Sequence, residues 1–245
     1  MKAGIMQSYF FPYLGYFQLI DAVDIFHLYE HVSFRKKSFI TKNNILDKGR
    51  KIPVAIKVPI AKKSSFKTIK EIEIQKDNTW KKQLLKLIYF NYKKAAYFEA
   101  IYPLIEKSIM RDETSLHRYN SKIIIDICNY LNINTSIKFD NDDMLDMEKA
   151  LKENTEVLEE IKSKRILNIC KKIGANTYIN PIGGIELYDK DYFQQHNMEL
   201  FFIEAQIEPY KQFDNEYTPY LSIIDVLMHQ GKEGSQKMIK QHKLI

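Results

Sequence analysis

The chain has 245 residues, 45% of them hydrophobic and 28% charged, which is enough for one large domain with a buried core, so we expect a single domain over 1–245. No apolar run approaches the roughly 20 residues of a membrane-spanning helix, and the amino terminus lacks a signal-peptide pattern, which indicates a cytoplasmic protein without a transmembrane segment. The net charge of +6 comes from scattered lysines, and the lack of a basic stripe argues against nucleic acid as a partner.

The first thirty residues predict a β-loop-α-β unit. A strand is expected over 2–9, a helix over 14–22 and a second apolar run over 23–29. An aromatic turn at 7–16 joins the first strand to the helix. Such a unit is the building block of a parallel sheet, and ligands bind at the turn that follows a strand's carboxyl end.

The middle of the chain predicts two strands and then helices. Strands are expected over 52–60 and 68–75, with the charged stretch 61–67 as a hairpin loop between them. From Asp77 the apolar residues recur with helical spacing. Further helices are expected over 98–110 and 114–131.

The last part of the chain continues the alternation. A strand is expected over 133–139, an acidic loop over 140–143 that lacks calcium-loop spacing, and a helix over 155–173 that Gly174 ends. Strands follow over 176–179 and 198–204, and Thr218-Pro219 begins a last helix. This order predicts an α/β fold, with a mainly parallel, doubly wound sheet, helices on both faces and a largely helical carboxyl-terminal part. The loops at 7–16, 180–187 and 206–219 could meet on one face.

The chain carries none of the common catalytic fingerprints, such as a glycine-rich phosphate loop or a Gly-x-Ser-x-Gly elbow. Tyr13-Leu14-Gly15-Tyr16 stands where doubly wound nucleotidylyltransferases carry His-x-Gly-His. Tyrosine is neutral near pH 7, so the tyrosines cannot supply the charge of imidazole. The turn is either an aromatic core or a ligand pocket lined by Gln7, Tyr9, Tyr13 and Tyr16.

A second candidate group follows the second predicted strand. His31 could take a proton from an attacking amine and Glu30 could orient it, while Arg35, Lys36 and Asn43 could bind phosphate. The alternative is that His31 is an ordinary surface histidine.

Asp225 interrupts an apolar stripe on the last helix and stands four residues before His229, so the two side chains share a helix face. Asp225 either handles a proton or closes a hydrogen bond on the helix surface. We expect His27 to lie in the core, as do the thiols of Cys128 and Cys170, and we expect the remaining histidines, His117, His196 and His242, to lie on the surface. No metal site is predicted.

Several segments together resemble the WbqC-like family. They are Met6–Phe17, Tyr29–Val32 with Lys36 and Asn43, Trp80, Tyr92–Phe98, Gly183-Gly184, Tyr210-x-Gln212 and Tyr220–Asp225. The chain differs from that family's usual pattern in having Ser8 for proline, Glu30 and His31 for aspartates, and Phe39 for tryptophan. The likeness adds Tyr210 and Gln212 to the expected substrate-binding residues.

The family occurs among genes for O-antigen and other surface polysaccharides, and it has been proposed to contain glycine transferases. The resemblance therefore implies an N-acyltransferase, glycyl or another aminoacyl, that modifies a nucleotide-linked amino sugar. Such a reaction needs no tightly bound cofactor but requires an activated donor, which could be a carrier-protein thioester, a coenzyme A thioester or an ATP-derived acyl group. The alternative is a nucleotide- or nucleotide-sugar-binding module of the same pathway.

Overall fold

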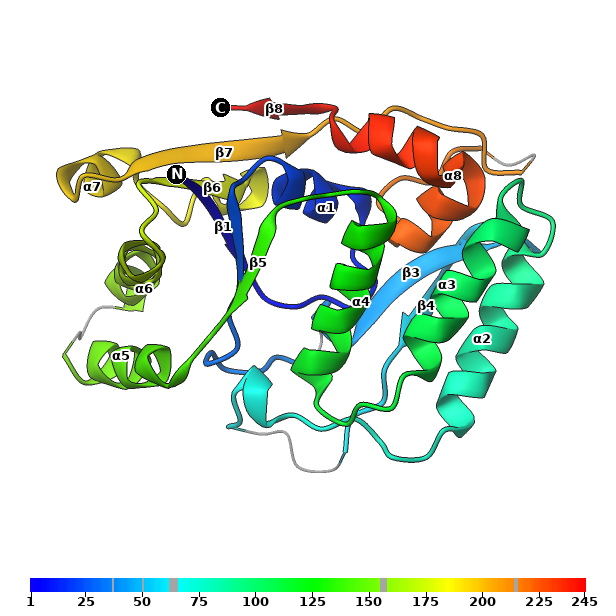
Figure 1. Ribbon diagram of the computed structural model, residues 1–245, viewed down its shortest axis with the longest axis horizontal. Coiled ribbons are helices and arrows are strands. Elements are labelled where there is room, and N and C mark those ends of the chain that lie inside the picture. Colours follow the sequence, from blue (N-terminus) through cyan, green and yellow to red (C-terminus); the bar gives the residue numbers. More distant parts are fainter. Residues whose placement is uncertain (37, 50, 62–65, 155–157, 214–215) are drawn as a thin grey trace.

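The computed structural model describes residues 1–245 except 37, 50, 62–65, 155–157 and 214–215. Its larger sheet has the strand order β5-β2-β1-β6-β7-β8 (Figure 1), and every neighbouring pair is parallel except β7 and β8. Its strands are β1 (Lys2–Met6), β2 (Ile25–Leu28), β5 (Ser136–Phe139), β6 (Thr177–Pro181), β7 (Glu199–Ala205) and β8 (His242–Leu244). The predicted α/β class with a mainly parallel sheet is confirmed.

Both faces of this sheet are buried, because apolar residues along its central strands alternate between two cores. Ala3 and Ile5 pack in one core, whereas Phe26 and Leu28 pack in the other. Gly4 allows close packing in the second core, since a Cβ there would lie 3.0 Å from the Phe26 ring. A sheet buried on both faces requires helices on both sides, as predicted.

Helices cover the sheet on both sides (Figure 1). One core includes residues of α5 (Asp142–Glu153), α6 (Leu158–Ile173) and α7 (Lys190–Gln195). The other includes residues of α1 (Leu14–Asp21), α4 (Leu116–Tyr130) and α8 (Ile223–Ile239). Helix α8 supplies the predicted helical carboxyl-terminal part.

A second structural layer extends the larger core away from the sheet (Figure 1). It contains an antiparallel hairpin and two packed helices. Its elements are β3 (Lys42–Asp47), β4 (Ile52–Lys57), the 3₁₀ turn η1 (Ile69–Glu71), α2 (Thr79–Tyr92) and α3 (Phe98–Met110), and a second 3₁₀ turn, η2 (Ile182–Gly184), follows β6.

The strand order gives the sheet a topological switch point between β1 and β6, from which the chain continues in opposite directions across the sheet. In open α/β sheets, ligands bind outside the carboxyl ends of the strands. Because β1, β6 and β7 are parallel, the loops 7–16, 180–187 and 206–219 leave the sheet at this same edge. The loop before α8 covers the start of α1: Ile223 N donates to Pro12 O at 2.9 Å, and Ser222 Oγ donates to Phe11 O at 2.8 Å.

Helix α8 breaks at Gly231, where φ is 62° and ψ is −165°, a conformation essentially restricted to glycine. A Cβ at this position would lie 2.5 Å from the ring of Tyr97. Next to the break, Tyr97 N donates to Met228 O at 3.1 Å, which fixes the start of α3 against α8. The glycine is therefore needed for both the backbone angle and the close packing.

Two expectations about local structure are wrong, and one strand was missed. Residues 68–75 do not form a strand, because Thr68 and Glu71 make a reciprocal cap that closes η1. The acidic stretch 140–143 is not all loop, since Asn141 caps α5 and acidic residues favour a helix amino terminus. Strand β3 was not expected at all, because 42–47 begins with three polar residues and shows no alternation of polar and apolar positions. The predicted loop 61–67 and the start of the predicted helix 155–173 fall partly outside the described residues.

In the described part of the chain, no helix has both the length and the apolar character needed to cross a membrane.

Candidate functional site

A pocket of about 630 Å³ lies at the carboxyl edge of the sheet, where β2 and β5 end. Its wall is formed by residues that follow these strands, by Lys70 of η1 and by one face of α4. The lining residues are Glu30, Lys70, Ser115, His117, Arg118, Ser121, Lys122, Ile125, Phe139 and Asp140. This position is the usual ligand-binding edge of a parallel sheet.

Asp140 holds the chain that follows β2. Its Oδ1 accepts a 2.7 Å hydrogen bond from His27 Nε2, and its Oδ2 accepts the backbone N–H groups of Glu30 and His31 at 2.7 and 3.0 Å. Burial acts to raise the pKa of Asp140, but these hydrogen bonds outweigh burial and lower the pKa. An ionised Asp140 thus fixes the backbone from which Glu30 projects.

Glu30 is a carboxyl in the wall of this pocket whose pKa lies near neutrality. Burial raises its pKa to about 7, even though Lys70 acts to lower it. The Lys70 ammonium lies 3.7 Å from Glu30 Oε1. A carboxyl with a pKa near 7 is suited to accept and donate protons at neutral pH.

His117 lies beside Glu30, with Nε2 3.3 Å from Glu30 Oε2. On the other side of the ring, Nδ1 is 3.2 Å from Ser8 Oγ, and Asn120 Nδ2 donates to Ser8 O at 2.9 Å. Burial lowers the pKa of His117 to about 4, so the ring is neutral at pH 7. Its Nε2 also lies 3.5 Å from Ser121 Oγ, so the ring is hydrogen-bonded to Ser8 and Ser121 and lies beside Glu30; Ser8 is fully buried, whereas Glu30 and His117 line the pocket.

The rim of the pocket is cationic. Lys70, Arg118 and Lys122 line it, and Lys122 donates to Glu113 at 2.9 Å. Arg118 has no ion-pair partner among the described residues. The amino terminus of α4, capped by Ser115, also faces the pocket and adds the positive end of the helix dipole. The pocket is thus suited to an anionic ligand.

The structure places His31 behind Glu30 and away from this pocket. His31 is buried, and its Nε2 lies 3.9 Å from Asp140 Oδ2, beyond hydrogen-bond distance. Burial lowers the pKa of His31. Of the two residues predicted to handle a proton here, the structure thus places Glu30 in the pocket wall and leaves His31 outside it.

The aromatic turn after β1 divides between core and surface. The hydroxyl of Tyr16 is buried and donates to Gln7 O at 2.8 Å, and Tyr9 packs 5.4 Å from the Tyr16 ring. Tyr13 is half-buried and lies 6.3 Å from the exposed ring of Tyr220. Gln7 and Tyr9 leave the same sheet edge as Glu30, whereas Tyr13 contacts the loop before α8.

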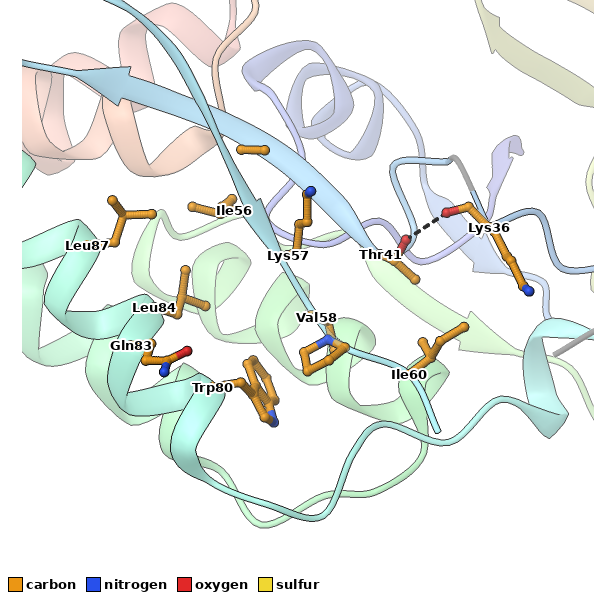
Figure 2. A pocket seen from close by; sticks show the side chains of 12 residues that line it. Lys36, Thr41, Ile56, Lys57, Val58, Ile60, Trp80, Gln83, Leu84 and Leu87 are labelled. Atoms are coloured by element: carbon orange, nitrogen blue, oxygen red, sulfur yellow. Dashed lines mark hydrogen bonds between the residues drawn. The ribbon is translucent and has the colours of Figure 1, made fainter. Parts of the chain in front are cut away.

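The structure does not bring the three predicted phosphate-binding residues to the pocket of Glu30. Arg35 is exposed, and Asn43 is buried, where its Nδ2 donates to Phe11 O at 2.7 Å and anchors the aromatic turn. Lys36 instead lines a separate, shallow apolar groove of about 550 Å³. Figure 2 shows that groove, with Trp80, Leu84 and Leu87 of α2 facing β4 and the residues after it.

Asp225 is fully buried, so a surface hydrogen bond is the wrong description of it. Its carboxylate accepts hydrogen bonds from Tyr92 Oη at 2.6 Å, Tyr210 Oη at 2.8 Å and Gln212 Nε2 at 2.8 Å. His229 Nε2 lies 3.9 Å away. Asp225, Tyr210 and Gln212 are thus brought together, as a buried network that holds the 206–219 loop on α8.

The remaining histidines differ in how deeply they are buried. His27 is buried, as predicted, and His196 and His242 are half-buried. His117 is 3% exposed, so the surface prediction for it is wrong: packing of the sheet edge over α4 covers it. In the described residues, no three His, Cys, Asp or Glu side chains are placed to hold one metal ion.

Sequence reasoning missed Lys70, His117, Arg118 and Asp140 as site residues. One signal was available, since His117 and Ser121 are four residues apart, as are Arg118 and Lys122, which gives the predicted helix 114–131 one polar face. Lys70 and Asp140 carry no such pattern.

Comparison with known proteins gives one family. The model described as the WbqC-like protein family matches residues 7–237. An uncharacterized protein of Mycobacterium tuberculosis (strain ATCC 25618 / H37Rv) is 28% identical to this chain over 237 residues, which cover 95% of each chain. No solved structure matches the chain. Because the family model spans nearly the whole sequence, the chain belongs to the WbqC-like protein family.

Proposed function

We propose that this protein is an N-acyltransferase that joins an activated acyl or aminoacyl group, such as glycyl, to the amine of a nucleotide-linked amino sugar for a surface polysaccharide. The observation that carries the proposal is Glu30, a carboxyl with a pKa of about 7 in a pocket with a cationic rim. Amide formation needs a base for the amine and groups that hold the anionic substrate in position. In this pocket, Glu30 would be the base and the cationic rim would hold the substrate.

In the proposed reaction, the neutral amine attacks the acyl carbonyl carbon and forms the C–N bond. Glu30 takes the proton that the nitrogen loses, and the bond between the carbonyl carbon and the leaving group breaks, so that the leaving group departs with its electron pair. Glu30 then returns the proton to the leaving group or to water. His117, a neutral ring held by Ser8 and Ser121, would pack against the carboxyl of Glu30, 3.3 Å away, and keep it in place.

The same pocket suggests how the substrate is held. Arg118 and Lys70 would bind the diphosphate of a nucleotide sugar, because both cations line the pocket and Arg can bind phosphate with two parallel hydrogen bonds. Phe139 is 42% exposed and lines the same pocket, so its ring offers a surface for a base or sugar. A carrier-protein thioester, a coenzyme A thioester or an ATP-derived acyl group would supply the donor.

The second candidate is a nucleotide-sugar-binding module without turnover. The switch point between β1 and β6 favours it, since this position binds nucleotides in many doubly wound folds whatever chemistry follows.

A binding experiment tests the binding of a nucleotide sugar, which both candidate functions require. Thermal unfolding is measured with UDP-, dTDP- and GDP-linked amino sugars for the wild type, Arg118→Gln, Lys36→Gln and the charge-matched control Lys107→Gln, a substitution of an exposed residue on α3. A ligand at a hundred times its dissociation constant stabilises the fold by about 2.7 kcal/mol. We expect stabilisation by one nucleotide sugar, lost in Arg118→Gln and kept in the control. Loss in Lys36→Gln instead would move the phosphate site back to the 35–43 segment.

Turnover separates the two candidates. The stabilising sugar is incubated with glycyl and acyl donors, and amide product is detected by mass spectrometry. Glu30→Gln should bind the sugar normally and lose about 10²–10⁴-fold in kcat, the usual contribution of a general base. Binding without product from any donor class would favour the module, and full activity in Glu30→Gln would exclude Glu30 as the base.

A further inference from the structure

A further pocket, which shares no lining residue with the pocket of Glu30, is lined by positive charge. Its volume is about 470 Å³, and Lys48, Lys94, Lys211, Phe213 and His229 line it. Lys48 comes from the β3–β4 turn, Lys94 from the turn between α2 and α3, and Lys211 from the loop before α8. Three separate segments thus bring their ammonium groups to one cavity.

These ammonium groups lack carboxylate partners in the described part of the chain. Lys94 and Lys211 are exposed, whereas Lys48 is half-buried with its Nζ 4.3 Å from the centroid of the Phe213 ring. The Lys48 backbone is held as well, since its N–H donates to Asn91 Oδ1 at 3.0 Å. Like charges gathered in one cavity repel each other unless an anion lies between them.

His229 gives a second, independent indication of a ligand. Its side chain is only 5% exposed, yet its ring lines the pocket, and its Nε2 is buried without a hydrogen-bond partner in the described structure. The nearest carboxylate oxygen, Asp225 Oδ2, is 3.9 Å from this nitrogen, beyond hydrogen-bond distance, and the Asp225 carboxylate already accepts hydrogen bonds from Tyr92, Tyr210 and Gln212. The ring therefore lies between a satisfied buried carboxylate and the basic cavity.

The backbone around the pocket also favours an anion. Ala95 and Ala96 line it immediately before α3, whose amino-terminal end carries the positive end of the helix dipole. Gly231 breaks α8 just after His229, and the resulting contact between Tyr97 and α8 fixes this helix start beside the pocket.

We propose that this pocket binds a phosphate group, either free inorganic phosphate or the phosphate of a nucleotide. Lys48, Lys94 and Lys211 would provide the charge, and protonated His229 would donate a hydrogen bond. The site is distinct from the pocket of Glu30 and shares no lining residue with it.

The test is an NMR titration of the His229 imidazole at pH 7 and constant ionic strength, with His229→Gln used to assign its signal. The groups around this ring are Asp225, Tyr92, Tyr210, Phe213 and Lys48. Inorganic phosphate and adenosine 3′,5′-bisphosphate are titrated separately. Saturable shifts and a raised His229 pKa on binding are expected, and tighter binding of the bisphosphate would identify a nucleotide as the source.

Matched variants decide whether the shifts report this site. Lys94→Gln with Lys211→Gln should weaken binding by about fivefold or more, as expected from the loss of two ion pairs, whereas Lys107→Gln and Arg118→Gln should leave it unchanged. Three outcomes would overturn the proposal: no saturation, equal weakening in Lys107→Gln, or loss confined to Arg118→Gln. The last outcome would place the phosphate in the pocket of Glu30.

Discussion

Replacing Glu30 by glutamine should stabilise the protein at alkaline pH and leave its stability nearly unchanged at acidic pH. The folded state raises the Glu30 pKa from 4.5 to about 7. Between these values the folded state binds more protons than the unfolded state, so the Glu30 contribution to the free energy of unfolding falls as pH rises. Glutamine resembles the protonated carboxyl and does not ionise, which removes this loss.

The size of the effect follows from the shift. Raising the Glu30 pKa from 4.5 to about 7, at about 1.4 kcal/mol for each pKa unit, gives an upper limit of about 3.5 kcal/mol. The pocket is open to solvent and Lys70 is 43% exposed, so screening reduces this limit to about 1–2 kcal/mol. The difference between Glu30→Gln and the wild type should therefore be near zero at pH 4.5 and reach this value by pH 8.

Urea unfolding of both proteins at pH 4.5, 6 and 8 measures the difference between their free energies of unfolding. His117 titrates in both proteins, so its contribution largely cancels in this difference. Glu113→Gln serves as a control of the opposite sign. Burial acts to raise the Glu113 pKa, but hydrogen bonds from Lys122 and the backbone outweigh it and lower the pKa, so this substitution should cost stability at pH 8. A Glu30→Gln difference that does not change with pH, or a less stable variant at pH 8, would refute the reasoning.

Three further predictions concern the fold. Gly231→Ala should cost about 2–5 kcal/mol of stability in urea unfolding, because alanine is strained at this backbone angle and its Cβ would overlap the Tyr97 ring. A Gly231→Ala variant as stable as the wild type would contradict this account of the break in α8. Tyr92→Phe removes a hydrogen bond to buried Asp225 and should cost about 1.5–3 kcal/mol, whereas Tyr89→Phe, on the exposed side of α2, should change stability by less than about 0.5 kcal/mol. Burial raises the pKa of both cysteines to about 12, so a thiol reagent should label neither in the native protein at pH 8 and both in urea; rapid native labelling would show that a cysteine is accessible.

The sequence alone determined the fold class, because strand and helix periodicities are local properties of the chain. The apolar runs at 2–9, 23–29 and 198–204 are typical of strands buried on both faces, and the helical stripes between them require a parallel sheet with helices on both sides. The family could be identified for a similar reason, since its motifs are contiguous segments. The sequence also selected Glu30 as a candidate site residue, because it follows a strand.

Only the tertiary structure decided which side chains meet there. Asp140 reaches Glu30 because β5 pairs with β2, and His117 reaches it because α4 packs beside that edge, although both lie more than 80 positions away along the chain. No periodicity encodes such contacts. The same packing buried Asn43 and Asp225, and it left Lys36 beside a different groove. The pKa of Glu30 is likewise a property of its surroundings, because burial and neighbouring charge set it and the residue type does not.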